Sequence, residues 1–213
     1  MTCALLVTLL LETPWLLGGA ACVSFAVLVM HHRGDWTPRG GFGVANAITL
    51  LRLGLEAIMI SLLGRAPGPL LGALVALTLG LDAVDGWLAR RQRISSEFGA
   101  HFDMEVDAFL VLATSVLLWL SGRCGAWVLV AGALRYGYVL CCAWWPPRGG
   151  SMPRTLLGRS AFAAVVVGHA LAFTSSGPLA TLCAALGTAL VTLSFARSFA
   201  YGYRAPARSM LDS

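Results

Sequence analysis

The chain has no lysine and few charged residues of any kind. Charged residues make up 12% of its 213 residues, whereas hydrophobic residues make up 58% and the mean hydropathy is +0.78. Ordinary globular chains are about 25% charged. A chain this apolar cannot cover a water-facing surface, so the composition excludes an ordinary soluble domain. It favours an integral membrane protein whose helices pack against one another.

The sequence also lacks the marks of several other classes. Its six cysteines include no C-x-x-C pair and lie mostly in apolar stretches, which argues against a disulfide or zinc framework. The net charge of +5 comes from fifteen arginines spread along the chain, with no basic run interleaved with aromatic residues. Nucleic acid is therefore not an expected partner. No basic residue precedes Arg33, although a secretory signal peptide begins with a positive region.

Long apolar stretches, separated by short polar ones, predict the membrane topology. A bilayer core of about 30 Å needs about 20 apolar residues in a helix. The predicted spans are 4–30, 45–63, 69–89, 99–120, 125–145, 156–174 and 178–200. This pattern predicts an all-α integral membrane protein, a six-helix transmembrane bundle with an additional N-terminal hydrophobic helix. Glu12 and Pro14 interrupt that first segment, and whether it spans the membrane is left open.

The distribution of arginine predicts which side of the membrane each loop faces. Ten arginines fall in the loops 31–45, 90–98 and 146–159 and in the tail: Arg33, Arg39, Arg90, Arg91, Arg93, Arg148, Arg154, Arg159, Arg204 and Arg208. The opposite loops hold only Arg65 and Arg123. Because positive loops stay on the cytoplasmic side, the first set is predicted to be cytoplasmic. The protein is then expected to be multi-pass in a plasma or inner membrane.

Residues 82–107 contain six of the chain's ten acidic residues, although apolar spans lie on both sides. Asp82 and Asp85 are three residues apart near the cytoplasmic end of one predicted span. Asp103 and Asp107 are four apart near the start of the next. Both spacings place a pair on one helix face, so the two pairs can face each other at one depth in the membrane.

Four converging carboxylates in a membrane would repel one another unless something compensates their charge. Bound divalent cations would do so. Ligands that offer only oxygen suit Mg²⁺ or Mn²⁺, and two such ions can bridge phosphate oxygens. The small residues Gly86 and Ala89 leave one face bare for a flat ligand, Arg90 offers an anion-binding side chain, and Gly99 lets the partner helix approach. The alternative is an interfacial charge cluster, with the acids paired to Arg90, Arg91 and Arg93.

These positions resemble the signature of the CDP-alcohol phosphotransferases (CDP-alcohol phosphatidyltransferases), integral membrane enzymes of phospholipid synthesis. Their motif is D-x-x-D-G-x-x-A-R, eight residues, and then G-x-x-x-D-x-x-x-D. It is matched throughout by Asp82, Asp85, Gly86, Ala89, Arg90, Gly99, Asp103 and Asp107. The stretch "NAITLLR" is also similar to the family's first-helix pattern, at Asn46, Thr49 and Arg52.

The resemblance covers about residues 44–203 and implies a division of the chain. Residues 1–43 would be an N-terminal hydrophobic segment with a polar linker, 44–203 the membrane domain, and 204–213 a short cytoplasmic tail. The family's fold implies six membrane helices around a polar cavity that faces the cytoplasm. It also implies a homodimer.

The activity implied by the resemblance is a metal-dependent transfer of a phosphatidyl group from CDP-diacylglycerol to a small alcohol, with release of CMP. Two divalent cations, Mg²⁺ or Mn²⁺, would be held by four aspartates, of which Asp107 would also be the catalytic base. The ligands would be Asp82, Asp85, Asp103 and Asp107. The CDP-linked donor would be bound by Asn46, Thr49, Asp82, Gly86, Ala89 and Arg90.

Further charged residues are interpreted individually. Glu105 points off the face of its two neighbouring aspartates, and pairing with an arginine is favoured over lining an acceptor pocket. Arg52 and Glu56, four apart in one span, are most simply an intramembrane ion pair. Arg135 has no local acid, so it should face the polar cavity and could contact the acceptor.

Three loop arginines have two possible interpretations. They could form a pocket for an anionic acceptor, or they could be the ordinary positive charge of a cytoplasmic loop: Arg148, Arg154 and Arg159. His31, His32 and His169 are interpreted as structural.

Three other functions fit parts of the pattern. An aminoalcohol-type enzyme would move phosphocholine or phosphoethanolamine from its CDP ester onto a lipid. A membrane prenyltransferase would also bind Mg²⁺ and diphosphate through aspartates, but a G-x-x-A-R element is not expected there. A non-catalytic scaffold with a decayed site would have lost at least one aspartate, and none is lost. The acceptor alcohol, which could be glycerol phosphate, an inositol phosphate, serine or another small alcohol, is left open.

Overall fold

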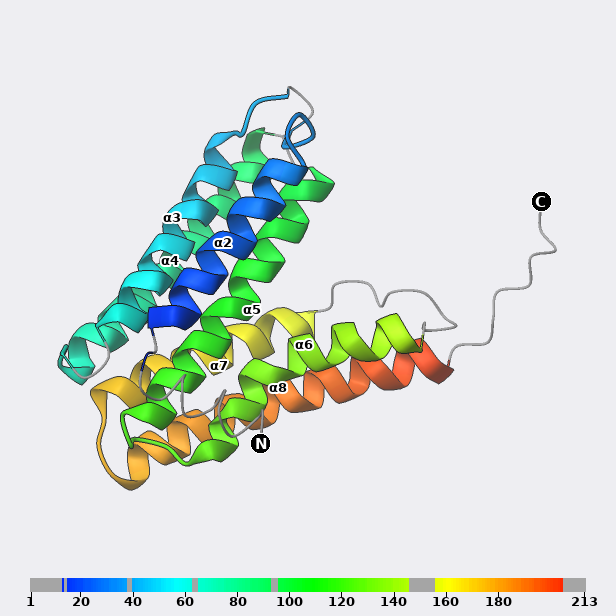
Figure 1. The fold of residues 1–213 in the computed structure, drawn as a ribbon. Coiled ribbons are helices and arrows are strands. Elements are labelled where there is room, and N and C mark those ends of the chain that lie inside the picture. Colours follow the sequence, from blue (N-terminus) through cyan, green and yellow to red (C-terminus); the bar gives the residue numbers. More distant parts are fainter. Residues whose placement is uncertain are drawn as a thin grey trace.

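The protein is a bundle of helices, seen here in a computed structural model (Figure 1). The structure describes residues 13, 15–37, 40–62, 65–92, 96–145 and 156–204, and these ranges contain no strand. The helices are α2 (Trp15–His31), α3 (Val44–Ser61), α4 (Gly68–Gln92), α5 (Glu97–Leu120), α6 (Leu129–Trp144), α7 (Leu156–Thr174) and α8 (Pro178–Arg204), with a 3₁₀ helix η1 (Ala126–Val128) before α6. The predicted six-helix bundle with an extra N-terminal helix is confirmed. Residues 4–12 of the first predicted span, and the tail from 205 to 213, lie outside the described residues.

Local chemistry explains several of the helix ends. Ser96 precedes α5 with extended backbone, and its hydroxyl accepts a hydrogen bond from the Gly99 N–H at 2.9 Å, as a helix-capping serine does. Gly177 has a φ of 60°, which favours glycine, and Pro178 then begins α8 with a φ suited to a first helical turn. These residues define where α5 and α8 begin after short connections.

Five helical segments in the described part of the chain are long and apolar enough to cross a membrane: Val44–Ser61, Gly68–Leu88, Ala126–Trp144, Leu157–Thr174 and Pro178–Tyr203. Gly18–His31 is a shorter apolar segment. Helix α5 is 24 residues long, but four acidic residues in its first half lower its hydropathy. These helices indicate a multi-pass membrane protein, in which α5 is the most acidic of the described helices.

The helices form two groups inclined to each other (Figure 1). Helices α2, α3, α4 and α5 lie alongside one another, while α6, α7 and α8 make the second group. Helix α5 packs on α6, and α4 packs on α7, so these two contacts join the groups. The linker after α2 lies at the same end of the molecule as the end of α4 and the start of α5 (Figure 1).

Glycines allow the closest helix contacts. A Cβ on Gly132 of α6 would lie 2.6 Å from the Cα of Leu112 in α5, and one on Gly168 of α7 would lie 2.5 Å from the carbonyl oxygen of Cys183 in α8. Real Cβ atoms do not approach backbone this closely. Since helices in a membrane associate through packing of small residues, these glycines bring the second group together and attach it to α5.

The additional helix α2 covers the face formed by α3 and α5. Phe25 of α2 makes edge-to-face contacts with Phe102 and Phe109 of α5, with ring centroids 6.0 Å apart in each case. Leu53 and Ile60 of α3 belong to the same buried cluster. The N-terminal segment is therefore packed onto the bundle through a core of its own.

Candidate active site

A cavity of about 700 Å³ lies where the two helix groups meet. Six helices contribute to its wall: α3, α4, α5, α6, α7 and α8. Its polar and charged lining residues are Asn46, Thr49, Asp82, Asp85, Ser96, Asp103, Asp107, Arg135, Arg159, Ser194 and Ser198. A cavity of this size can hold a small-molecule ligand, and its lining combines apolar wall with convergent polar groups.

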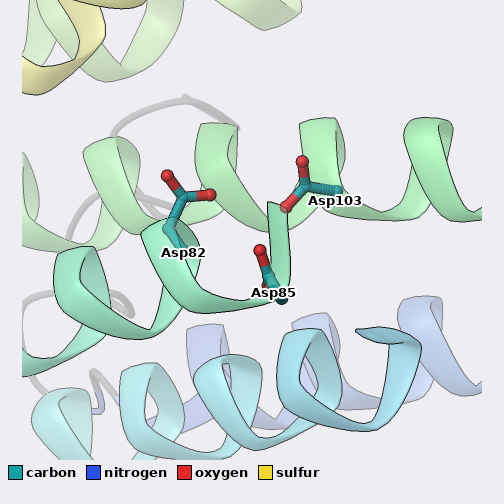
Figure 2. A group of neighbouring side chains, drawn as sticks. All are labelled: Asp82, Asp85 and Asp103. Carbon is teal, nitrogen blue, oxygen red and sulfur yellow. The ribbon is translucent and has the colours of Figure 1, made fainter. Parts of the chain in front are cut away.

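Three of the predicted aspartates come together at one wall of this cavity. Asp82 and Asp85 project from α4 toward Asp103 of α5 (Figure 2). One carboxylate oxygen from each lies within 4.8 Å of the others, an arrangement that could hold a metal ion. Asp85 is buried, whereas Asp82 and Asp103 are half-buried and reach the cavity. The structure therefore brings the α4 pair together with Asp103, one member of the α5 pair.

Arg52 of α3 joins all four aspartates. Its Nη1 donates to Asp103 at 2.9 Å, to Asp82 at 3.0 Å and to Asp85 at 3.2 Å. Its Nη2 donates to Asp107. The arginine is fully buried, so its guanidinium places one positive charge at the centre of four carboxylates.

The predicted ion pair between Arg52 and Glu56 is wrong. The salt bridges of Arg52 run to the aspartates, and both carboxylate oxygens of Glu56 are buried without a hydrogen-bond partner. The reason is the number and position of the competing acids. Four carboxylates on two neighbouring helices attract the guanidinium more strongly than one carboxylate on its own helix.

The first-helix residues line the same part of the cavity. Thr49 donates its hydroxyl to Oδ2 of Asp85 at 3.2 Å, and Asn46 donates its amide to the carbonyl oxygens of Phe42 at 2.7 Å and Trp36 at 3.2 Å. A Cβ on Gly99 would lie 2.9 Å from Oδ1 of Asn46. Gly99 therefore allows a close approach to α3, whereas the sequence had suggested an approach between the two helices that carry the aspartates.

Glu105 and Arg135 form an ion pair on another wall. Nη2 of Arg135 in α6 donates to Oε1 of Glu105 in α5 at 2.5 Å. The favoured pairing of Glu105 with an arginine is confirmed, and Arg135 does line the cavity. Arg159, near the start of α7, lines it as an exposed residue.

The other predicted residues belong only in part, or not at all, to the described part of the structure. Gly86 lines the cavity. Ala89 and Arg90 belong to α4, but their side chains are outside the described part of the structure. Arg148 and Arg154 lie outside the described residues altogether.

Two features at or near the cavity were not predicted. Ser194 and Ser198 of α8 both line the cavity, and the only sequence signal for them is two hydroxyls four residues apart in an apolar helix. The carbonyl oxygen of Trp36 accepts hydrogen bonds from both Asn46 and Ser96, the latter at 2.7 Å. A backbone acceptor in a linker leaves no signal in the sequence.

Two of the histidines interpreted as structural have local partners. His169 is buried with its Nδ1 2.8 Å from the hydroxyl oxygen of Thr114, and Nδ1 of His32 lies 3.0 Å from the carbonyl oxygen of Leu28. Neither lines the cavity.

Comparison with known proteins identifies the class of this site. The family model for CDP-alcohol phosphatidyltransferase matches residues 42–198. The match covers most of the chain, and the protein belongs to this family of transferases. No curated protein sequence matches the chain. The family therefore indicates transfer of a phosphatidyl or phosphoalkyl group from a CDP-alcohol at a membrane.

Proposed function

We propose that the protein transfers a phosphatidyl group from CDP-diacylglycerol to a small alcohol and releases CMP, in a reaction that depends on divalent cations. The observation that carries the proposal is the group of oxygens from Asp82, Asp85 and Asp103 within 4.8 Å of one another, on the wall of a cavity of about 700 Å³. Within the family, such a site suits a diphosphate whose charge must be neutralised while one of its P–O bonds breaks.

The aspartates fit a metal centre by their chemistry and their present partner. They offer only oxygen, as Mg²⁺ and Mn²⁺ require, and they already surround a cation, the guanidinium of Arg52. Asp82, Asp85, Asp103 and Asp107 would hold two ions. When bound, these ions supply positive charge that stabilises the diphosphate and the departing CMP.

The roles of the chain's own residues follow from their positions. Asp107 would accept the proton of the attacking alcohol, whose oxygen forms a new bond to the phosphatidyl phosphorus. The bond from that phosphorus to the phosphate oxygen of CMP breaks, and CMP leaves with the bonding electron pair. Asn46, Thr49 and Gly86 line the wall beside the aspartates and would bind the nucleotide with Asp82. Ala89 and Arg90 are assigned to the nucleotide by the motif.

The acceptor is placed on the wall that carries the basic residues. Arg135 and Arg159 line the cavity from α6 and α7, the helices that pack on α5 and α4. A phosphorylated polyol would complement these charges, and Arg148 and Arg154 would extend the same set. We assign this subsite to an anionic alcohol.

Release of CMP tests the proposal. Purified protein with Mg²⁺ and CDP-diacylglycerol is assayed against glycerol phosphate, inositol phosphate, inositol and serine, with CDP-choline and diacylglycerol as the aminoalcohol arm. We expect one phosphorylated alcohol to stimulate release and EDTA to stop it. Asp107→Asn should abolish turnover, whereas Glu97→Gln, an exposed α5 residue away from the cavity, should not. Activity only in the aminoalcohol arm, or metal-independent activity, would contradict the proposal.

We further propose that the cavity faces the cytoplasm and that the protein is a homodimer. The first follows from the arginine distribution, and a protease-sensitive tag after Ser213 should then be cleaved only in inside-out vesicles. The second follows from the family resemblance, and native mass spectrometry in detergent would reveal it as twice the 22.4 kDa chain mass.

A further inference from the structure

Glu56 is a buried acid that the proposed reaction does not use. It lies in α3 with no exposed surface, and neither of its carboxylate oxygens has a hydrogen-bond partner. At 1.5 Å per residue it is about 18 Å along the helix from Val44, deep in a membrane-spanning segment. An acidic side chain at such a depth is costly unless it has a partner in some state of the protein.

The nearest cation on the same helix face is Arg52, one turn earlier. Positions four apart on a helix lie about 5–6 Å from each other at their Cβ atoms. Nη1 of Arg52 is shared among Asp82, Asp85 and Asp103, while its Nε is buried without a partner. Both Nη atoms of Arg52 are therefore bonded to the aspartates, and only its Nε has no partner. The two carboxylate oxygens of Glu56, which also have no partner, lie one helical turn away.

The guanidinium and a divalent cation would compete for the same oxygens. Arg52 contacts each aspartate of the proposed metal centre, including the three whose oxygens converge within 4.8 Å. A metal ion that takes those oxygens as ligands also repels a positive charge held among them. Binding of metal thus requires the guanidinium to find another acceptor without leaving the bundle.

We propose that Glu56 is the second acceptor for Arg52, so that the guanidinium neutralises the aspartates in the metal-free protein and pairs with Glu56 when divalent cations bind. The inference rests on the proposed metal-dependent function. In this arrangement Glu56 is a positioning residue, which acts on the metal centre only through Arg52. Rotation of the Arg52 side chain moves its guanidinium from the aspartates to Glu56 and leaves the aspartates to the metal ions, while the backbone of α3 stays in place.

The local charges support this exchange. Four aspartates, Glu56 and Arg52 together carry four negative charges when all are ionised, which equals the positive charge of two divalent cations. With the metal ions present, the aspartates no longer need the guanidinium, and Glu56 still lacks a counter-charge. The pairing of Arg52 with Glu56 leaves every charge in the metal-bound site compensated.

The alternative is that Glu56 merely fills space as a neutral side chain. The two roles predict different effects of substitution. Glu56→Gln keeps the shape and removes the acceptor for a cation, whereas Glu56→Asp keeps the charge and shortens the side chain. If Glu56 serves Arg52, Asp should be the better replacement for metal binding. If it fills space, Gln should be the better one.

Binding of Mn²⁺ to the purified full-length protein, followed by electron paramagnetic resonance without substrate, tests the inference. Glu56→Gln should weaken Mn²⁺ binding by about ten- to hundredfold, the usual effect of losing a group that positions a metal site. Glu56→Asp should recover most of the affinity. In the Arg52→Gln background no guanidinium competes, so adding Glu56→Gln should have little further effect. Glu97→Gln is the matched control, and thermal unfolding in EDTA verifies that each variant is folded.

Each outcome decides between the roles. The proposed exchange would be overturned if Glu56→Gln weakened Mn²⁺ binding equally in the wild-type and Arg52→Gln backgrounds, or if it had no effect on Mn²⁺ binding in either. If Arg52→Gln does not fold, the order of the Gln and Asp variants at Glu56 decides alone. If the wild-type protein does not bind Mn²⁺, the proposed metal-dependent function fails and this inference with it. Wild-type binding without an effect of Glu56 overturns the inference alone.

Discussion

Replacing Gly99 by alanine tests the contact that holds the start of α5 against α3. The added methyl would lie 2.9 Å from Oδ1 of Asn46 and 3.1 Å from the hydroxyl oxygen of Ser96. Both separations are too short for a carbon–oxygen contact, so a side chain must move. Asn46 must move further, because its Oδ1 is the closer of the two oxygens.

The magnitude follows from the bonds of Asn46. Its amide donates to the carbonyls of Phe42 and Trp36, and each such bond contributes about 1 kcal/mol to the free energy of unfolding. Loss of both costs about 2 kcal/mol. Alanine in place of glycine within a helix raises the free energy of unfolding by roughly 0.5–1 kcal/mol. We expect Gly99→Ala to lower the free energy of unfolding by about 1 kcal/mol.

Gly54→Ala is the control, because a Cβ there meets nothing within 4 Å, in the same helix as Asn46. That variant has only the gain in helix propensity, so the two variants should differ by about 2 kcal/mol in detergent unfolding titrations. CDP binding measured by calorimetry with Mg²⁺ should also weaken in Gly99→Ala, about fivefold for one lost nucleotide hydrogen bond. Equal stability of the two alanine variants, with unchanged CDP affinity, would refute the reasoning.

Three further substitutions test other parts of the structure. Asp103→Asn should weaken Mn²⁺ binding at least tenfold in titrations followed by electron paramagnetic resonance, whereas Glu97→Gln should leave it unchanged; equal loss in both would contradict the metal site. Arg135→Gln should raise the KM for an anionic acceptor more than Glu105→Gln does, because only Arg135→Gln removes a positive charge from the cavity wall. If steady-state kinetics gave the reverse order, Arg135 would not bind the acceptor. Phe25→Ala should destabilise the packing of α2 by about 3 kcal/mol and raise proteolysis of the linker near Trp36, and unchanged cleavage would show that α2 is held by other contacts.

The course of the chain was largely predictable because membrane helices follow composition. The predicted spans 69–89, 156–174 and 178–200 correspond closely to α4, α7 and α8. The stretch 125–145 was predicted as one span, but the structure begins it with the 3₁₀ turn Ala126–Val128 before α6. A window of apolar residues does not distinguish these two helix types, since both are equally apolar.

The aspartate site was predictable for a different reason. Helical spacing places Asp82 with Asp85, and Asp103 with Asp107, each pair on one face. That local rule accounts for each pair, whereas the two pairs meet because α4 and α5 both pack on α3, whose Arg52 contacts all four carboxylates. The partner of Arg52 could not be obtained from the same rules, because spacing along one helix reports only the neighbours on that helix.

Arg52 was assigned to Glu56 by a rule that is correct for isolated helices and incomplete for a packed bundle. Four buried or half-buried carboxylates on α4 and α5 lie within reach of the guanidinium, and together they attract it more strongly than the single carboxylate of Glu56. The four-residue spacing to Glu56 nevertheless places a second acceptor within reach of the same side chain. The proposed exchange makes Glu56 an alternative partner of this arginine, and the Mn²⁺ titrations described above test it.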